Sequence, residues 1–270
     1  MKTSVALSIL TVIFAGLPQA PQPGQPEPIT FGETFTIDSR VLGETRRINV
    51  YRPPAWGEEE NAPRPVLYMP DGGMAEDFLH IAGLLQVSVG NGSMRPYLLV
   101  GIENTERRRD MTGPTRVESD KTIASRVGGS AAFRQFIRDE LFPVIEARYP
   151  TQPSRAIMGE SLAGLFVVET LIEDPAMFDA YIAFDPSLWW NAGALVSRAA
   201  SLMGDRYAGR QLFLATSRDG DRDDATARFV SNLPASDTQG FAWQYIFMPD
   251  ETHGTIYHPA ALRAVREVFR

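Results

Sequence analysis

The sequence predicts an α/β protein with a mostly parallel central sheet and helices on both faces. Two observations predict this class. Short apolar runs recur along the chain, as in strands that are buried on both faces of a parallel sheet. Stretches with helical periodicity separate these runs, and strands that alternate with helices form parallel sheets covered on both sides. At 270 residues, 44% of them hydrophobic, the chain is long enough to bury such a core.

The expected sheet has about eight strands. It begins with an antiparallel pair, because residues 33–39 and 46–51 alternate polar and apolar side chains and Leu42-Gly43 suits the turn between them. The later strands are apolar throughout. They cover residues 66–69, 97–102, 156–158, 181–184, 212–215 and 243–248.

The expected helices lie between these strands. The clearest covers residues 130–149, where Phe133, Phe136 and Ile137 recur at helical spacing and Pro143 predicts a local kink. Residues 104–128 form the longest stretch without periodicity, and a loop of that size in a compact domain is often functional. Further helices are expected over residues 162–171, 192–203, 225–233 and 259–269.

The N-terminus has the pattern of an export signal. A basic start, Met1-Lys2, precedes the uncharged apolar run of residues 4–16, which is short for a membrane span but suits a signal peptide. We expect a signal over residues 1–20, with an uncleaved anchor as the alternative, a Pro-rich linker over 21–30 and one domain over 31–270. The mature chain is thus expected to be periplasmic or secreted, without a stable membrane span.

The composition excludes several classes of chemistry. There is no cysteine, so disulfides, thiol nucleophiles and Cys-rich zinc sites are absent. The three histidines form no H-E-x-x-H motif, and we expect neither a metal nor a cofactor. With 33 acidic and 26 basic residues the net charge is −7, which points away from nucleic acid as a partner.

The segment around Ser161 carries the most information. A buried strand runs into Gly159-Glu160-Ser161 and then directly into a helix, which is the arrangement of a nucleophile elbow. Ala163 replaces the usual second glycine but is still small. The alternative is a serine that merely caps the helix.

The partners of a catalytic serine would follow it in the order acid, then histidine. His253 follows the last expected strand, whereas His80 precedes the serine and His258 adjoins the final helix. We expect His253 to be the base and Asp219, nearest the end of the preceding strand, to be the acid. Other aspartates remain open as the acid, as does a dyad without one: Asp185, Asp221, Asp223 and Asp224.

The oxyanion hole is expected to use two backbone N–H groups. One belongs to Leu162, at the start of the helix after the serine. The other comes from the loop after strand 66–69, where Gly72 and Gly73 would let the backbone approach the reacting carbonyl. An ordinary turn is the alternative for this loop.

Together these segments resemble the putative esterase family of α/β-hydrolases, which includes siderophore (enterochelin) esterases and esterase D-like enzymes. The resemblance rests on residues 66–73 (VLYMPDGG), 100–115, 131–151, 154–171, 183–191 and 251–255 (ETHGT). It implies an α/β-hydrolase fold, Ser161 as nucleophile and His253 as base, and it places the loop at Gly72 in the oxyanion hole. The chain departs from many relatives at Glu160, Ala163 and Asp185.

The resemblance also places an arginine-rich segment and a tryptophan pair near the substrate. Arg107 and Arg109 could pair with substrate carboxylate or catecholate oxygens, or Arg109 could instead brace the long loop through Asp110. Trp189 and Trp190 could stack on an aromatic or sugar group, or could pack under the loop.

The sequence therefore predicts a serine carboxylic-ester hydrolase that acts through an acyl-enzyme on a small-molecule ester. Siderophore, feruloyl and acetyl or short-acyl esters all suit this machinery. The alternative from another class is a catalytically weak binding module for a siderophore or a glycan. A serine peptidase of the same fold is a third option.

Overall fold

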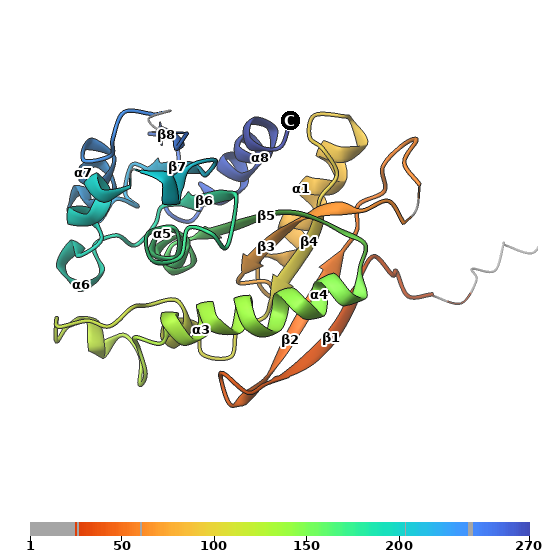
Figure 1. Cartoon of the computed structure of the whole chain (residues 1–270), viewed down its shortest axis with the longest axis horizontal. Helices are drawn as coiled ribbons and strands as arrows, with labels where there is room; N and C mark the ends of the chain where they lie inside the picture. The colour runs from red at the N-terminus through yellow and green to blue at the C-terminus, as the bar shows by residue number, and fades with distance from the viewer. Residues whose placement is uncertain (1–24, 26, 60, 203, 237–239) are drawn as a thin grey trace, which may run out of the picture. The chain divides into compact units, whose positions relative to one another are not determined.

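A computed structural model describes residues 25, 27–59, 61–202, 204–236 and 240–270 (Figure 1). The chain divides into two units, Met1–Phe31 and Gly32–Arg270, and every helix and strand described below belongs to the second. The predicted signal peptide lies outside the described residues. No helix in the described part of the chain is long and apolar enough to cross a membrane.

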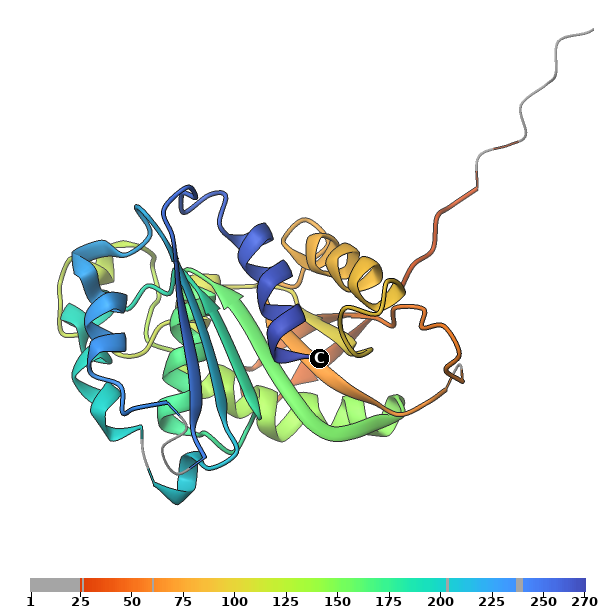
Figure 2. The ribbon, with the colours of Figure 1, turned by 90° about the horizontal axis from the view of Figure 1, so that it is seen from above.

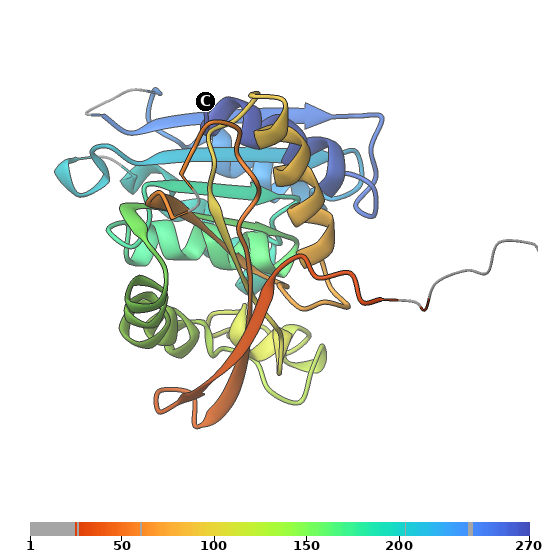
Figure 3. The same ribbon diagram turned by 90° about the vertical axis from the view of Figure 1, so that its right-hand side faces the viewer.

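The described chain forms a sheet of eight strands in the order β1-β2-β4-β3-β5-β6-β7-β8. β1 pairs antiparallel with β2, and β2 with β4, whereas the remaining neighbours are parallel. Figure 3 shows the twist of the sheet, because β1 and β2 run steeply across the direction of β7 and β8. The strands are β1 (Glu33–Ser39), β2 (Glu44–Tyr51), β3 (Arg64–Pro70), β4 (Leu98–Ile102), β5 (Thr151–Glu160), β6 (Ala180–Phe184), β7 (Gln211–Ser217) and β8 (Ala242–Met248).

Helices cover both faces of the sheet (Figure 2). One face packs against α1 (Phe78–Gly90) and α8 (Tyr257–Val268), and the other against α3 (Ser130–Phe136), α4 (Phe142–Arg148), α5 (Leu162–Glu173) and α7 (Ala225–Ser231). Alternate side chains of each strand enter the two cores: in β3, Val66 and Tyr68 face one, Leu67 and Met69 the other. The predicted α/β class, with helices on both faces, is confirmed.

The predicted helix over residues 130–149 is interrupted. A π-helical segment, Ile137–Leu141, separates α3 from α4. Pro143 lies in the first turn of α4, where its missing N–H is tolerated. A locally widened turn therefore precedes the proline, at which the sequence predicted a kink.

Four neighbouring parallel strands bring chemically active residues to one edge of the sheet. Ser161 follows β5, Asp185 follows β6, Ser217 ends β7, and His253 lies in the loop between β8 and α8. Because the carboxyl ends of parallel strands share one edge, loops distant in sequence meet there. This edge contains the candidate active site.

Candidate active site

Ser161 stands in a strained turn between β5 and α5. Its backbone has φ 60° and ψ −119°, a conformation that costs a non-glycine residue on the order of 1–3 kcal/mol. Two hydrogen bonds to the neighbouring β6 loop hold it: its N–H donates to Phe184 O (3.0 Å), and its carbonyl accepts from Ser187 N–H (3.0 Å). The turn also needs Gly159, because a Cβ there would lie 2.7 Å from the Cβ of Ala163. This is the geometry of a nucleophile elbow.

The imidazole of His253 contacts a buried carboxylate. Its Nδ1 lies 3.1 Å from Oδ2 of Asp185, whose side chain is fully buried, whereas the His253 side chain is 47% exposed. An ionised carboxylate only accepts hydrogen bonds, so Nδ1 donates and Nε2 is left as the basic nitrogen. Ser161 Oγ makes no hydrogen bond with a described residue here, and catalytic bonds are often long before substrate binds.

The last residues of β7 hold the Asp185 carboxylate in place. Ser217 donates to it twice, from its backbone N–H (2.7 Å) and from its hydroxyl (2.6 Å). Gly220 packs directly on the carboxyl group, since a Cβ at that position would lie 2.0 Å from Asp185 Cγ. The sequence interpretation missed both supporting residues, although a serine and a glycine just beyond a strand end could have been suspected.

The structure corrects the expectation for Asp219. Its carboxylate accepts from the backbone N–H of His253 (2.7 Å), and the Ser217 hydroxyl, which donates to Asp185, lies 3.2 Å from its Oδ1. It therefore positions the loop that bears the imidazole, while Asp185 contacts the ring. The pKa of Asp219 is lowered, chiefly by the hydrogen bond from the His253 backbone.

Two titratable groups at the elbow influence each other. The pKa of His253 is raised above its ordinary value of 6.5, first by the hydrogen bond to Asp185 and also by the charge of Glu160. Burial raises the pKa of Glu160 to about 7, with Asp77 and Asp185 adding to the shift and His253 opposing it. The imidazole therefore lies within electrostatic reach of the residue next to Ser161.

In the structure, the N–H groups of the expected oxyanion donors in the β3–α1 loop already have acceptors within the protein. Gly72 N–H donates to Ile102 O (3.0 Å), and Gly73 N–H donates to Oε2 of Glu76 (2.6 Å). Gly72 serves a close backbone approach, because a Cβ there would lie 2.3 Å from Gly101 Cα. Leu162, the first residue of α5, has no acceptor within its helix for its N–H, as the prediction requires.

Arg109 braces the long loop. Its guanidinium donates to Glu44 through Nη1 (3.0 Å) and Nη2 (2.7 Å), and to Asp110 through Nε (2.6 Å). Asp110 also pairs with the fully buried Arg46, at 2.6 Å. These contacts favour the alternative that Arg109 braces the loop over the expected contact with the substrate, because its donors are occupied by carboxylates of the protein.

Arg107 lies closer to the candidate nucleophile. It forms a bidentate pair with Asp71, through Nε (2.7 Å) and Nη2 (2.8 Å), and its side chain is 35% exposed. Its positive charge acts on the carboxyl of Glu160. Arg107 therefore remains the candidate for contact with an anionic group of a substrate.

The two tryptophans differ in their surroundings. Trp190 is buried, and its indole N–H donates to Gly113 O (2.9 Å), so it packs under the long loop. Trp189 is half-buried, and the guanidinium of Arg222 lies 4.4 Å from the centre of its ring.

The other two histidines form a pair away from the serine. His80 of α1 and His258 of α8 approach to 2.9 Å between Nε2 and Nδ1, and their rings stack at 5.0 Å. Burial and the neighbouring His258 lower the pKa of His80. Among the described residues no group of three or more His, Asp or Glu side chains is placed to hold a metal ion.

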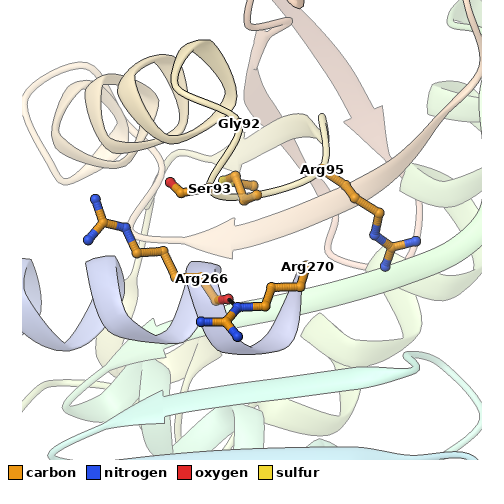
Figure 4. Close-up of a pocket in the computed structure, with 6 residues that line it drawn as sticks. Gly92, Ser93, Arg95, Arg266 and Arg270 are labelled. Carbon is orange, nitrogen blue, oxygen red and sulfur yellow. Dashed lines mark hydrogen bonds between the residues drawn. The ribbon is translucent and has the colours of Figure 1, made fainter.

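A cavity of about 390 Å³ lies at the opposite end of α8 from His253. It is lined by Gly92, Ser93, Arg95, Arg266 and Arg270, beyond the C-terminal end of α1 and before β4. Figure 4 shows the guanidinium groups of its three arginines pointing in different directions. The cavity is therefore no part of the site at Ser161.

Comparison with known proteins agrees with this geometry. The family described as "Putative esterase" matches residues 39–253, which is most of the chain. The chain belongs to the putative esterase family. Its predicted resemblance to that family is confirmed, and the family is one of carboxylic-ester hydrolases.

Two curated relatives of this chain show how far the similarity extends. The siderophore triacetylfusarinine C esterase of Aspergillus fumigatus is 30% identical over 66% of this chain and 63% of its own length. The ferri-bacillibactin esterase BesA of Bacillus subtilis is 35% identical over 59% of each chain. The chain thus matches less than two thirds of the length of these two curated relatives.

A solved structure covers more of the chain. The IroE-like serine hydrolase of Shewanella oneidensis superposes with a TM-score of 0.78, is 28% identical, and covers 88% of this chain and 80% of its own. The likeness confirms the α/β-hydrolase fold.

Proposed function

We propose that the protein is a serine carboxylic-ester hydrolase whose triad is Ser161, His253 and Asp185. The hydrogen bond between His253 and the buried Asp185, at the same sheet edge as the Ser161 elbow, carries the proposal. Each group has the surroundings that its role requires. The nucleophile lies in a strained, half-buried turn, the base has an Nε2 that no described residue hydrogen-bonds, and a fixed anion lies behind it.

In the proposed reaction, Ser161 Oγ attacks the ester carbonyl carbon while His253 Nε2 takes the hydroxyl proton. The oxyanion accepts a hydrogen bond from Leu162 N–H, and the N-terminal end of α5 favours its negative charge. The intermediate collapses to an acyl-serine, and His253 returns the proton to the leaving alcohol. Water, activated by the same histidine, then cleaves the acyl-enzyme.

We further propose siderophore-type esters as the substrate class. The names of the two curated relatives support this choice, since both describe siderophore esterases. The position of Arg107 beside Glu160 also supports it, because a guanidinium suits the oxygen anions of a metal-chelating ligand. Feruloyl and short-acyl esters are the alternatives within the same mechanism.

A panel of esters, assayed with matched variants, tests both the proposed mechanism and the proposed substrate class. It includes p-nitrophenyl butyrate, a feruloyl ester and a ferric catecholate trilactone, with wild-type protein and Ser161→Ala. Hydrolysis that is abolished by Ser161→Ala supports the mechanism, and the highest kcat/KM for the trilactone supports the substrate class. A fluorophosphonate probe that fails to label the native protein at Ser161 would instead favour the inert binding module.

We also propose that the protein is exported, on the pattern of residues 1–20 alone. Fractionation of cells that express the full chain, followed by mass determination of the exported product, tests this. Recovery of the intact chain from the cytoplasm would contradict it.

A further inference from the structure

A smaller cavity, of about 190 Å³, lies along α5. Leu165 and Glu169 of α5 line one side, and Trp190 and Leu195 line the other. Leu165 lies one turn after Ser161, to whose carbonyl its N–H donates (2.9 Å), so this lining residue is about 6 Å along the helix axis from the serine. We call it the α5 cavity.

The wall of the α5 cavity is held by hydrogen bonds between two loops. The Trp190 indole N–H donates to Gly113 O. Asn191 has a left-handed backbone (φ 51°, ψ 47°), and its N–H donates to Asp120 Oδ2 (2.8 Å) while its Oδ1 accepts from Arg116 N–H (2.9 Å). Strained residues persist where the surroundings over-determine them, commonly at ligand sites. The cavity is therefore preformed.

One end of the α5 cavity is polar. Glu169 is only 9% exposed, and its Oε2 has no hydrogen-bond partner in the described part of the chain. The nearest cation, Arg134, lies 3.6 Å away. A Cβ at position 113 would lie 2.4 Å from Glu169 Oε1, so the glycine leaves room for the carboxylate. Arg134 Nη1 faces Oε2 but also lacks a hydrogen-bond partner among the described residues, so the pair is incompletely satisfied, and a ligand hydroxyl would add a hydrogen bond to the carboxylate.

The remaining features define the chemistry of a ligand. Leu165, Trp190 and Leu195 give apolar walls, and the second acid, Glu173, is already paired with Arg198. An engineered apolar cavity of about 150 Å³ holds one benzene molecule, so about 190 Å³ accommodates a single substituted ring. With Arg134 facing Glu169, a neutral donor suits the polar end better than a cation.

We propose that the α5 cavity is a binding site for one uncharged six-membered ring that bears a hydroxyl group, with the hydroxyl donating to Glu169. Its use as a subsite for a ring of an ester substrate rests on the proposed function, whereas the binding itself requires no hydrolysis.

Phenol and its methyl ether, anisole, are the probes, and their binding is measured by ligand-observed NMR. Ala194 is exposed and lines the cavity, so Ala194→Trp places a ring in it, whereas Ser197→Trp adds the same side chain on the next exposed turn, outside it. We expect Ala194→Trp to weaken phenol binding at least about tenfold, roughly 1.4 kcal/mol, and Ser197→Trp to leave it unchanged. Near-ultraviolet circular dichroism confirms that both variants fold.

The outcomes separate this proposal from the proposed function. Absence of phenol binding, equal binding to wild type and Ala194→Trp, or equal affinity for phenol and anisole would each overturn it. If phenol binds with the expected pattern while no ester is hydrolysed, the cavity proposal stands and the esterase proposal fails. Hydrolysis that depends on Ser161, without phenol binding, gives the opposite result.

Discussion

Asp185 at the end of β6, and not an aspartate after β7, contacts the His253 imidazole, with 3.1 Å between Oδ2 and Nδ1. β7 contributes Ser217, which donates two hydrogen bonds to the same carboxylate. β6 is the immediate neighbour of β5, so its loop lies next to Ser161. The order of serine, acid and histidine along the chain is kept, although the acid follows a different strand from the one expected.

Replacing Asp185 should therefore disable hydrolysis. Asp185→Asn removes the anion that fixes the imidazole tautomer and stabilises the imidazolium, and a comparable change in a serine protease lowers kcat about 10⁴-fold. We expect a loss of about 10³–10⁴ in kcat for p-nitrophenyl butyrate. Asp219→Asn is the matched control, because this carboxylate contacts the His253 backbone and the Ser217 hydroxyl but not the imidazole, and it should cost about tenfold or less. The reverse ranking would assign the acid to Asp219.

The pH dependence of hydrolysis should report the environment of His253. The base works only when neutral, and its pKa is raised, so kcat/KM should reach half its maximum above pH 6.5. Glu160→Gln removes one of the causes of the raised pKa and should shift this midpoint downward. The two groups are coupled, so each midpoint belongs to the pair. A midpoint that is unchanged or raised in Glu160→Gln would contradict this account.

Hydrophobic periodicity predicted most of the fold because it reflects burial directly. The runs at 181–184 and 212–215 are apolar throughout because both faces of β6 and β7 are covered by helices. Residues 137–141 were expected to continue one helix, but they form a π-helical segment. Side-chain periodicity does not distinguish a single widened turn from a regular one.

The candidate site was predictable only where backbone context identifies a residue. Ser161 is marked by a strand, a sharp turn and a helix in succession, all local in sequence. The choice between Asp185 and Asp219 depends on which loop reaches the imidazole, and that is set by strand order in space. The role of Arg109 was also not predictable from the local sequence, because its partner Glu44 lies 65 positions away along the chain.

Glu160 should make the fold less stable as the pH rises. Its pKa is about 7 in the folded protein and 4.5 ordinarily, so the native state holds an extra proton between these values. Stability therefore falls from pH 4.5 to 7, and the full penalty applies above 7. We expect Glu160→Gln to raise Tm at pH 8 by about 2–4 °C, on the order of 1 kcal/mol, and to have no such effect at pH 4. Equal shifts at both pH values would indicate a change in packing instead.

Arg109 should matter for stability and not for substrate choice. Arg109→Ala leaves the buried Asp110 with Arg46 alone and removes two bonds to Glu44, so we expect a loss of about 2–4 kcal/mol by denaturant unfolding. Arg108→Ala, at an exposed neighbour, is the control. Arg109 holds the pKa of Glu44 at about 2, so the difference between wild type and Arg109→Ala should shrink as the pH falls from 4.5 towards 2. A changed preference among esters with unchanged stability would restore a substrate role for Arg109.

Adding a single methyl group at Gly220 should impair catalysis, because it would displace the Asp185 carboxylate. Its Cβ would lie 2.0 Å from Asp185 Cγ, and the backbone there has no positive φ, so the main effect of Gly220→Ala is to displace the carboxylate from His253. We expect kcat to fall at least about tenfold, with a stability loss of about 1–3 kcal/mol from overpacking. Gly254→Ala is the control, because a Cβ there meets nothing within 4 Å. Folded Gly220→Ala protein with wild-type kcat would show that hydrolysis does not need the Asp185–His253 contact.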